Sequence, residues 1–340
     1  MKAHWKSLLI GAFLSGFVVL LGGFNANKPR IVVLQSFDQD VPWVRHVDAG
    51  LRDVLRQNRR PVAVAWHYMG LNRKLRPEQR EAAAIEARRF IAQQDPDIVI
   101  AVDDESSAYV ARHLAGRDRP RLVFVSINQP PEHYGYAGAH NVTGIAEKLP
   151  LVAVRDAMLT IRPGRSIRIA ALAVDNQTGQ AELAQVQSFD WSPHQLTSAT
   201  KVSSFAQWQA FVRNASGQAD VLLVLSDEGL AHSSSDARPV AGSTVTQWTE
   251  ANSLPLPLGI EDSYVEEGGS LKVSPSPADY GQQAMRLALT WVDAGAAPPP
   301  PVVTSSHFNV GMRASALAAR GVRLPAIYVE AARLGNSLFP

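Results

Sequence analysis

The distribution of apolar residues along the first half of the chain predicts alternating strands and helices. Short, predominantly apolar runs, typical of strands buried on both faces, occur at residues 31–35, 62–69, 98–102 and 122–127. Between these runs, apolar residues recur at helical spacing, which predicts helices over residues 43–55, 77–94 and 106–114. A repeated strand–helix order favours a parallel sheet that is covered by helices on both faces.

The same alternation restarts near Thr143 and Gly144 and predicts a second α/β unit of similar size. Its expected strands are residues 167–174, 196–202, 221–225 and 256–260, and its expected helices are 152–161, 179–189, 205–214 and 244–251. The tail differs from both units. It predicts a short strand at 270–273, a helix at 277–293, a stiff proline-rich connector, an extended run at 302–310 and a last helix at 313–320.

The first residues of the chain have the pattern of a leader. Lys2 and Lys6 precede an uncharged run over residues 8–24, and polar Asn25 follows it. A basic end, an apolar middle and a polar exit are typical of a secretory signal. The run of 17 residues is nevertheless close to the roughly 20 that span a bilayer. We expect residues 1–27 to be a signal peptide or an N-terminal membrane anchor, and the body to be exported to the periplasm.

Length and composition narrow the remaining possibilities. The 340 residues, less a leader, fit two domains of about 150 residues. The net charge of +2 is small and the basic residues are spread along the chain, which argues against a nucleic-acid partner. The chain has no cysteine, which excludes disulfides, thiolate chemistry, cysteine-rich zinc sites and the acylated cysteine of lipoproteins.

Polar and aromatic residues follow the predicted strands, where open parallel sheets bind their ligands. The candidate ligand-binding residues are Ser36, Phe37, Trp43, Asp103, Asp104, Asn128, Asp175, Asp227, Asp262 and Tyr264. Two such rims facing each other would form a cleft that closes on a small molecule. The alternative is structural: Asp, Asn and Ser after a strand often cap the next helix, and loop aromatics often pack in a core.

Catalytic and metal-binding patterns are weak. The sequence has no nucleophile elbow, no phosphate loop and no paired-histidine zinc motif, and its nine histidines are scattered without metal spacing. The run Asp103-Asp104-Glu105 could hold a divalent ion, but the sequence does not force a second acidic cluster to meet it. We therefore expect no enzyme activity, no cofactor and no metal site.

Three segments, taken in order, resemble one known family. The first is IVVLQSFDQDVPW, residues 31–43, and the second is NVTGI, residues 141–145, followed by a helix and Arg162-Pro163-Gly164. The third begins at YGQQA, residues 280–284, and continues through the prolines at 298–301 to Phe308-Asn309 and an Ala-rich helix. Together they resemble the ABC-transporter substrate-binding proteins of the tryptophan- and tyrosine-receptor kind, which have the type I periplasmic-binding fold.

The resemblance implies two Rossmann-like lobes with parallel sheets, joined by three crossing strands. Lobe 1 would be residues 28–142 plus 264–297, and lobe 2 would be 143–263 plus 298–340. A small-molecule solute, such as an amino acid or a related compound, would be bound between them and passed to an ABC permease. The sequence departs from the family in lacking the lipoprotein cysteine, and the His232–Ser235 loop matches nothing in the family pattern.

Two other functions remain open on the sequence alone. The chain could be an extracytoplasmic input protein for a membrane sensor, a histidine kinase or cyclase, because the first segment resembles relatives that act beside kinases. It could also be an exported α/β hydrolase. That function would need a nucleophile activated by a base, and the spacing of the serines and histidines suggests no such pair.

Overall fold

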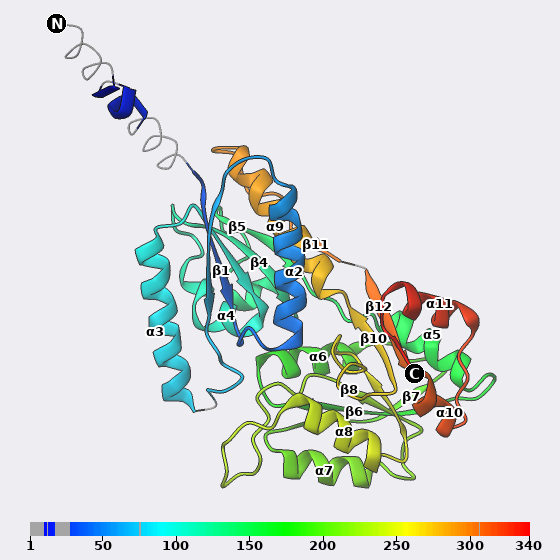
Figure 1. The fold of residues 1–340 in the computed structure, drawn as a ribbon. Coiled ribbons are helices and arrows are strands. Elements are labelled where there is room, and N and C mark those ends of the chain that lie inside the picture. The colour runs from blue at the N-terminus through cyan, green and yellow to red at the C-terminus, as the bar shows by residue number, and fades with distance from the viewer. Residues whose placement is uncertain (1–9, 12, 18–27, 75, 306) are drawn as a thin grey trace, which may run out of the picture.

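The computed structural model describes residues 10–11, 13–17, 28–74, 76–305 and 307–340. Most of the expected leader, residues 1–27, therefore lies outside the described residues. Within the parts that are described, no helix is both long enough and apolar enough to cross a membrane. From residue 28 onward the chain forms two α/β lobes, which lie one above the other in Figure 1.

The first lobe is built on a six-stranded sheet in the order β11-β5-β4-β3-β1-β2, and all its neighbouring strands are parallel. Its strands are β1 (Arg30–Gln35), β2 (Ala63–Tyr68), β3 (Ile98–Val102), β4 (Arg121–Ile127), β5 (Val142–Ala146) and β11 (Val303–Thr304). Consecutive residues of β1 and β3 enter two different hydrophobic clusters. Apolar side chains are buried on both faces of the sheet. This two-sided burial explains why the central strands are predominantly apolar.

The second lobe contains a seven-stranded sheet in the order β13-β12-β10-β9-β8-β6-β7. Its strands are β6 (Arg168–Val174), β7 (Gln195–Val202), β8 (Val221–Val224), β9 (Leu256–Gly259), β10 (Leu271–Pro275), β12 (Phe308–Arg313) and β13 (Leu338–Phe339). Only the β10–β12 pair is antiparallel among its described pairs. Two largely parallel sheets with helical cover confirm the predicted α/β class.

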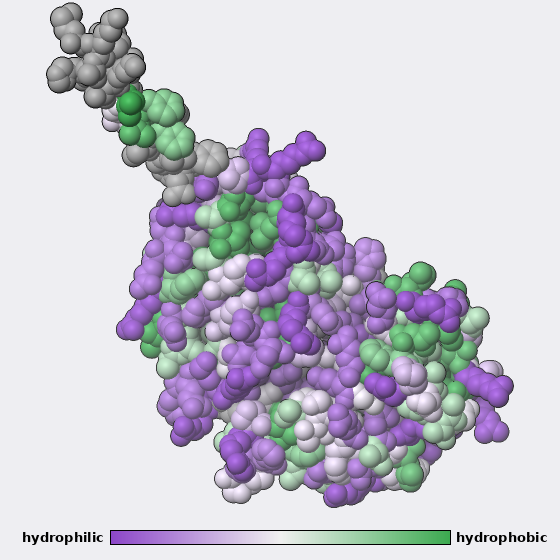
Figure 2. Space-filling model, in the orientation of Figure 1, coloured by the Kyte–Doolittle hydropathy of each residue, from purple (hydrophilic) through white to green (hydrophobic). Residues whose placement is uncertain are grey.

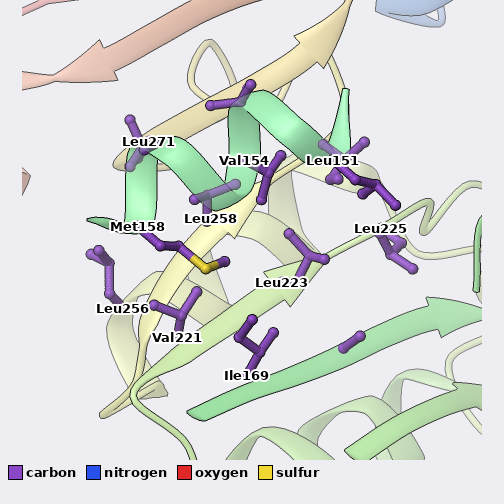
Figure 3. Close-up of a cluster of buried hydrophobic side chains, with 14 of the residues drawn as sticks. Leu151, Val154, Met158, Ile169, Val221, Leu223, Leu225, Leu256, Leu258 and Leu271 are labelled. Carbon is purple, nitrogen blue, oxygen red and sulfur yellow. The ribbon is translucent and has the colours of Figure 1, made fainter. Parts of the chain in front are cut away.

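Helices cover both faces of each sheet (Figure 1). Those of the first lobe are α2 (Pro42–Gln57), α3 (Pro77–Gln94), α4 (Asp103–Tyr109) and α9 (Pro277–Asp293), with short 3-10 turns at Ala111–His113 and Pro131–Tyr134. Those of the second lobe are α5 (Leu151–Ile161), α6 (Gln177–Ser188), α7 (Phe205–Asn214), α8 (Gly242–Asn252), α10 (Ala314–Ala319) and α11 (Ala326–Leu334). Figure 3 shows Leu151, Val154 and Met158 of α5 packed over the strands of the second sheet.

The chain passes between the lobes three times, after β5, between β10 and α9, and between β11 and β12. Strand pairing shifts the lobe boundaries predicted from the sequence. The predicted boundary after residue 142 divides β5, but all of β5 pairs with β4 in the first sheet. Likewise β10, expected in lobe 1, pairs with β9 and β12 of the second sheet, and β11, expected in lobe 2, pairs with β5 of the first.

Helices α2 and α9 pack closely because each carries a glycine at the contact. A Cβ atom at Gly281 would overlap the Val47 carbonyl, and one at Gly50 would overlap the Ala278 carbonyl. We expect Gly281→Ala to lower the free energy of unfolding by about 2 kcal/mol or more, because backbone atoms cannot move aside as a side chain can. Chemical denaturation measures this loss. Thr290→Ala, at an exposed position of the same helix, is the control, and an equal loss in both variants would contradict the packing role.

Candidate functional site

A cavity lies between the two lobes, where the carboxyl ends of both sheets face each other. In this arrangement of the lobes its volume is about 20 Å³, which is room for about one water molecule. Its lining residues are Phe37, Trp43, Asp103, Ser126, Asn128, Glu147, Thr178, Glu182, Ser226, Glu228 and Glu261. The residues up to Asn128 belong to the first lobe, Glu147 lies at the first crossing, and the others belong to the second lobe. Residues just beyond β1, β3, β4, β8 and β9 thus meet in one place, as expected for open parallel sheets.

Two neighbouring aspartates at the end of β3 have different environments. Asp103 lines the cavity, has a positive φ of 80°, and accepts a hydrogen bond of 2.9 Å from the Thr178 hydroxyl across the gap. Asp104 is fully buried and accepts hydrogen bonds from the Tyr134 hydroxyl (2.6 Å) and from the backbone N–H groups of Asn128 and Gln129. Asp104 therefore holds the loop after β4 in place, whereas Asp103 faces the cavity.

Polar contacts join the lobes around the cavity. Besides the bond from Thr178 to Asp103, the Gln185 side-chain amide donates to the side-chain Oδ1 of Asn128 at 3.1 Å. On the α2 side, Nδ1 of His46 lies 2.8 Å from the carboxylate of Asp262. Because these bonds connect one lobe to the other, the structure is in a closed arrangement.

The charge of the cavity lining is one-sided. Asp103, Glu147, Glu182, Glu228 and Glu261 contribute five carboxyl groups, and no Lys, Arg or His is among the described residues that line it. Carboxylates that are buried close together repel each other and lose hydration, so their charged forms are disfavoured.

The pKa values of these carboxyls are raised accordingly. Burial, then the Glu182 and Asp103 charges, raise the pKa of Glu147 well above its usual range. Burial raises the pKa of Glu182 to about 8, although the Ser226 N–H donates to its carboxylate and opposes the shift. Burial and the nearby Glu267 raise the pKa of Glu228 to about 7, and burial with the charges of Glu182 and Glu147 raises that of Glu261.

Asp262, beyond β9, has the opposite electrostatic environment. It forms a buried ion pair of 2.7 Å with Lys272 of β10, and it also accepts hydrogen bonds from Ser274 and Asn309. Burial alone would raise the pKa of Asp262, but the His46 hydrogen bond and the Lys272 ammonium outweigh burial and hold this pKa well below its usual range. Asp262 thus joins the crossing strands of the second lobe to α2 of the first.

The structure brings four of the ten predicted site residues to the cavity wall: Phe37, Trp43, Asp103 and Asn128. Ser36 is buried beside them, where its hydroxyl donates to the Val102 carbonyl and accepts from the Ser106 N–H. Asp227 is half-buried between the cavity residues Ser226 and Glu228.

The remaining predicted residues lie away from the cavity. Asp175 forms a surface ion pair of 3.0 Å with Lys201. Tyr264 is buried in the hydrophobic core of the second lobe, where it packs against Gly259 and Gly269 and its hydroxyl bonds to Glu250. Tyr264 thus follows the core-packing alternative, whereas Asp104 caps no helix and instead organises the loop after β4.

Most of the acidic lining was missing from the predicted set. Glu228 and Glu261 follow β8 and β9 and are the sequence neighbours of Asp227 and Asp262. The choice of polar residues after each strand could therefore have included them. Glu182 lies on α6 and Glu147 at a crossing, where no strand-end pattern applies. Ser126 lies inside β4 with a positive φ of 55°, beside the irregularity in the β4–β5 pairing, and no sequence signal marks it.

Comparison with known proteins gives structural matches alone. No family model matches the sequence, and no curated protein matches it. The chain is similar in structure to a conserved domain protein of Vibrio cholerae, at 14% identity and a TM-score of 0.70, over 92% of this chain and 100% of that one. It is also similar to an ABC domain in complex with L-Trp from Streptococcus pneumoniae, at 14% identity and a TM-score of 0.66, over 90% and 98% of the two chains.

A third similar structure is the ligand-free, open form of a substrate-binding protein with adhesive properties from Clostridium difficile, at 14% identity and a TM-score of 0.61, over 88% of this chain and 96% of that one. At such identities the likeness establishes the fold. The narrower resemblance to tryptophan and tyrosine receptors stays a prediction. The two lobes, their largely parallel sheets and the three crossings give this chain the two-lobed fold of the type I periplasmic binding proteins.

Proposed function

We propose that this chain is an exported solute-binding protein that captures a small molecule between its lobes and presents it to an ABC permease. The observation that carries the proposal is the cavity, which is lined from both lobes and enclosed by hydrogen bonds that cross between them. A solute bound first to one lobe would gain contacts from the other on closure. Its preference for the closed form would shift the protein from open to closed.

The chemistry of the lining supports binding in preference to catalysis. Covalent catalysis would need a nucleophile next to a base that can take its proton. Two serines, Ser126 and Ser226, line the cavity, but none of the described residues that line it is a histidine or lysine that could act as the base of a nucleophilic serine. The periplasmic location and the permease partner are part of this proposal, and the leader pattern and the fold support them.

The test combines a solute screen with a probe of closure. A solute that binds the folded state raises the melting temperature by mass action, about 2.7 kcal/mol of added stability at one hundred times its Kd. Small-angle scattering should show the radius of gyration falling as the same solute closes the lobes. Chemical turnover of the solute, instead of stabilisation, would contradict the binding function and favour an enzyme.

Trp43 provides a local reporter. It lines the cavity and is half-buried, so a bound solute changes its surroundings. We expect the solute to change the intrinsic fluorescence of the wild-type protein and Trp43→Phe to remove most of that change. Trp248→Phe is the matched control, because Trp248 is a half-buried tryptophan on α8 that packs against Phe205. A fluorescence change that survives in Trp43→Phe and is lost in Trp248→Phe would place the solute elsewhere.

A further inference from the structure

The electrostatics of the cavity restrict the class of solute that it can hold. The five carboxyl groups come from both walls, with Asp103 on the first lobe and Glu182, Glu228 and Glu261 on the second. The carboxylates of Glu228 and Glu261 have no hydrogen-bond or ion-pair partner among the residues that the structure describes. A site with this composition lacks the positive group that would recognise a carboxylate or phosphate of a ligand.

A second, independent feature is a buried hydroxyl in the cavity wall that lacks a hydrogen-bond partner. The Ser126 hydroxyl is buried, with 1% of the residue exposed, and it lines the cavity. It makes no hydrogen bond of ordinary geometry to any described residue, although the Glu147 carboxyl lies beside it. A buried hydroxyl without a partner costs about 1–3 kcal/mol, so a ligand that donates a hydrogen bond to Ser126 Oγ would remove that cost.

The aromatic residues of the lining also favour a bound cation. Phe37 is buried and Trp43 is half-buried at the first-lobe wall, opposite the acidic second lobe. Aromatic faces attract ammonium groups, with Trp the strongest of them, and also cover the carbon skeleton that joins such groups. Carboxylates, an unpaired hydroxyl and aromatic rings together form a site for an organic cation.

We infer that the solute is a small organic cation with two or more amino groups and no carboxylate, an aliphatic diamine being the simplest member of the class. This inference rests on the proposed function and deepens it. Both walls carry carboxyl groups, so one ammonium group can pair with carboxylates of the second lobe and another with Asp103 of the first. An added ligand carboxylate would meet no positive group in the lining, and an unpaired buried charge costs several kcal/mol.

Three probes with closely similar skeletons test the inference by calorimetry on the exported chain. Putrescine carries two ammonium groups on four carbons, ornithine adds a carboxylate to the same skeleton, and butane-1,4-diol replaces both ammonium groups by neutral hydroxyls. We expect putrescine to bind at least about 100-fold more tightly than either of the others. Tighter binding of ornithine or of butane-1,4-diol would overturn the inference.

Replacing one lining carboxylate by an amide should change ligand binding and protein stability in opposite directions, which a purely structural role would not produce. Glu261→Gln should weaken putrescine binding about tenfold, because a charge pair is lost. The same substitution should raise the melting temperature of the ligand-free protein, because a neutral amide replaces a carboxyl whose ionised form is disfavoured by burial and by the charges of Glu182 and Glu147. Glu132→Gln, at an exposed carboxylate of the first lobe, is the control and should change neither quantity.

The remaining outcomes separate the inference from the proposed function. If no diamine binds while a neutral or zwitterionic solute stabilises the protein and closes it, the cation inference is wrong and the binding function stands. If Ca²⁺ or Mg²⁺ alone stabilises the protein and competes with putrescine, the acidic lining is a metal site and the inference is overturned. If no probe of any class stabilises the protein, the inference and the proposed function both fail.

Discussion

Replacing Lys272 by Met is expected to lower the free energy of unfolding by about 3–5 kcal/mol, because the substitution leaves the buried Asp262 carboxylate without its cation. Lys272 is 1% exposed, its ammonium lies 2.7 Å from Asp262 Oδ1, and it also donates to the Asp262 backbone carbonyl. Methionine has a similar length and no charge, so the loss measures the unpaired carboxylate and not a cavity. Denaturation by urea at neutral pH gives the value.

The matched control is Lys201→Met, which removes the lysine of the surface pair with Asp175 in the same lobe. That pair is about as short, 3.0 Å, but the Lys201 side chain is 45% exposed. We expect it to change stability by less than about 1 kcal/mol, since water and salt screen an exposed pair. Similar losses in the two variants would contradict the importance of burial.

The loss of stability in Lys272→Met should depend on pH in one direction. The folded-state pKa of Asp262 is depressed, so its contribution to stability is present above the unfolded value, about 3.9, and is lost as the pH falls toward the folded value. In Lys272→Met the pKa is depressed less. The difference in stability between wild type and variant should therefore shrink as the pH is lowered below about 4.

The affinity for putrescine is expected to fall about tenfold for each unit by which the pH is lowered from 8 to 6, if one proton is displaced on binding. In the empty cavity Glu182 and Glu228 have pKa values of about 8 and about 7, so Glu182 is mostly protonated below pH 8 and Glu228 below pH 7. A bound ammonium favours their ionised forms and lowers these pKa values, so binding releases protons and becomes weaker in acid. The ammonium groups of the ligand stay charged, since alkylamines titrate near pH 10.

Calorimetry in two buffers of different ionisation enthalpy measures the released protons directly. Glu182→Gln removes one titrating group and should flatten the pH profile, while its neighbours Asp103, Glu147, Glu228 and Glu261 still titrate. Asp104 lies behind Asp103, and Asp227 and Glu267 lie beside Glu228, so these also belong to the acidic surroundings. An affinity that does not change between pH 6 and pH 8 would contradict the coupling.

The fold could be predicted from the sequence because burial on both faces makes the strands of a parallel sheet apolar throughout. The runs at 31–35 and 98–102 match β1 and β3 closely, and the helix at 277–293 matches α9 (Pro277–Asp293). Strand β5 was missed as an element because Val142–Ala146 is short and contains Gly144, which fits there since a Cβ would overlap Phe124. Helix α11 was not predicted, although Pro325 before it and Gly335 after it are typical helix boundary residues.

The candidate site could be predicted only in part, because a strand-end rule gives the edge of a sheet and not the direction of each side chain. Asp103 and Asp104 are adjacent in sequence, yet one faces the cavity and the other supports a loop. Tyr264 was predicted as a site residue because it is an aromatic residue after a strand. Its ring instead packs in the core, in space that Gly259 and Gly269 leave open because they have no Cβ. Glu147 and Glu182 reach the cavity only through the packing of the two lobes, which local sequence does not encode.

The exposed surface also carries an apolar region that the sequence pattern did not indicate. Figure 2 shows apolar residues gathered over α5 and α11 at one end of the second lobe, on a face that is otherwise mostly hydrophilic. Val152 of α5 and Ile327 and Leu334 of α11 are among the exposed apolar side chains of the described residues. All three belong to the second lobe, and none of them lines the cavity.

The three passages of the chain between the lobes set an order for its assembly during synthesis. Helix α9, which covers one face of the first sheet, and β11, which forms the edge of that sheet, leave the ribosome only after β6 to β10 of the other lobe have been made. A nascent chain that ends before residue 277 thus exposes the apolar side chains that Tyr280, Ala284 and Trp291 would cover. The first lobe is begun earliest and completed almost last, so its unfinished face needs protection, by a chaperone or by the secretion machinery, until translation is nearly over.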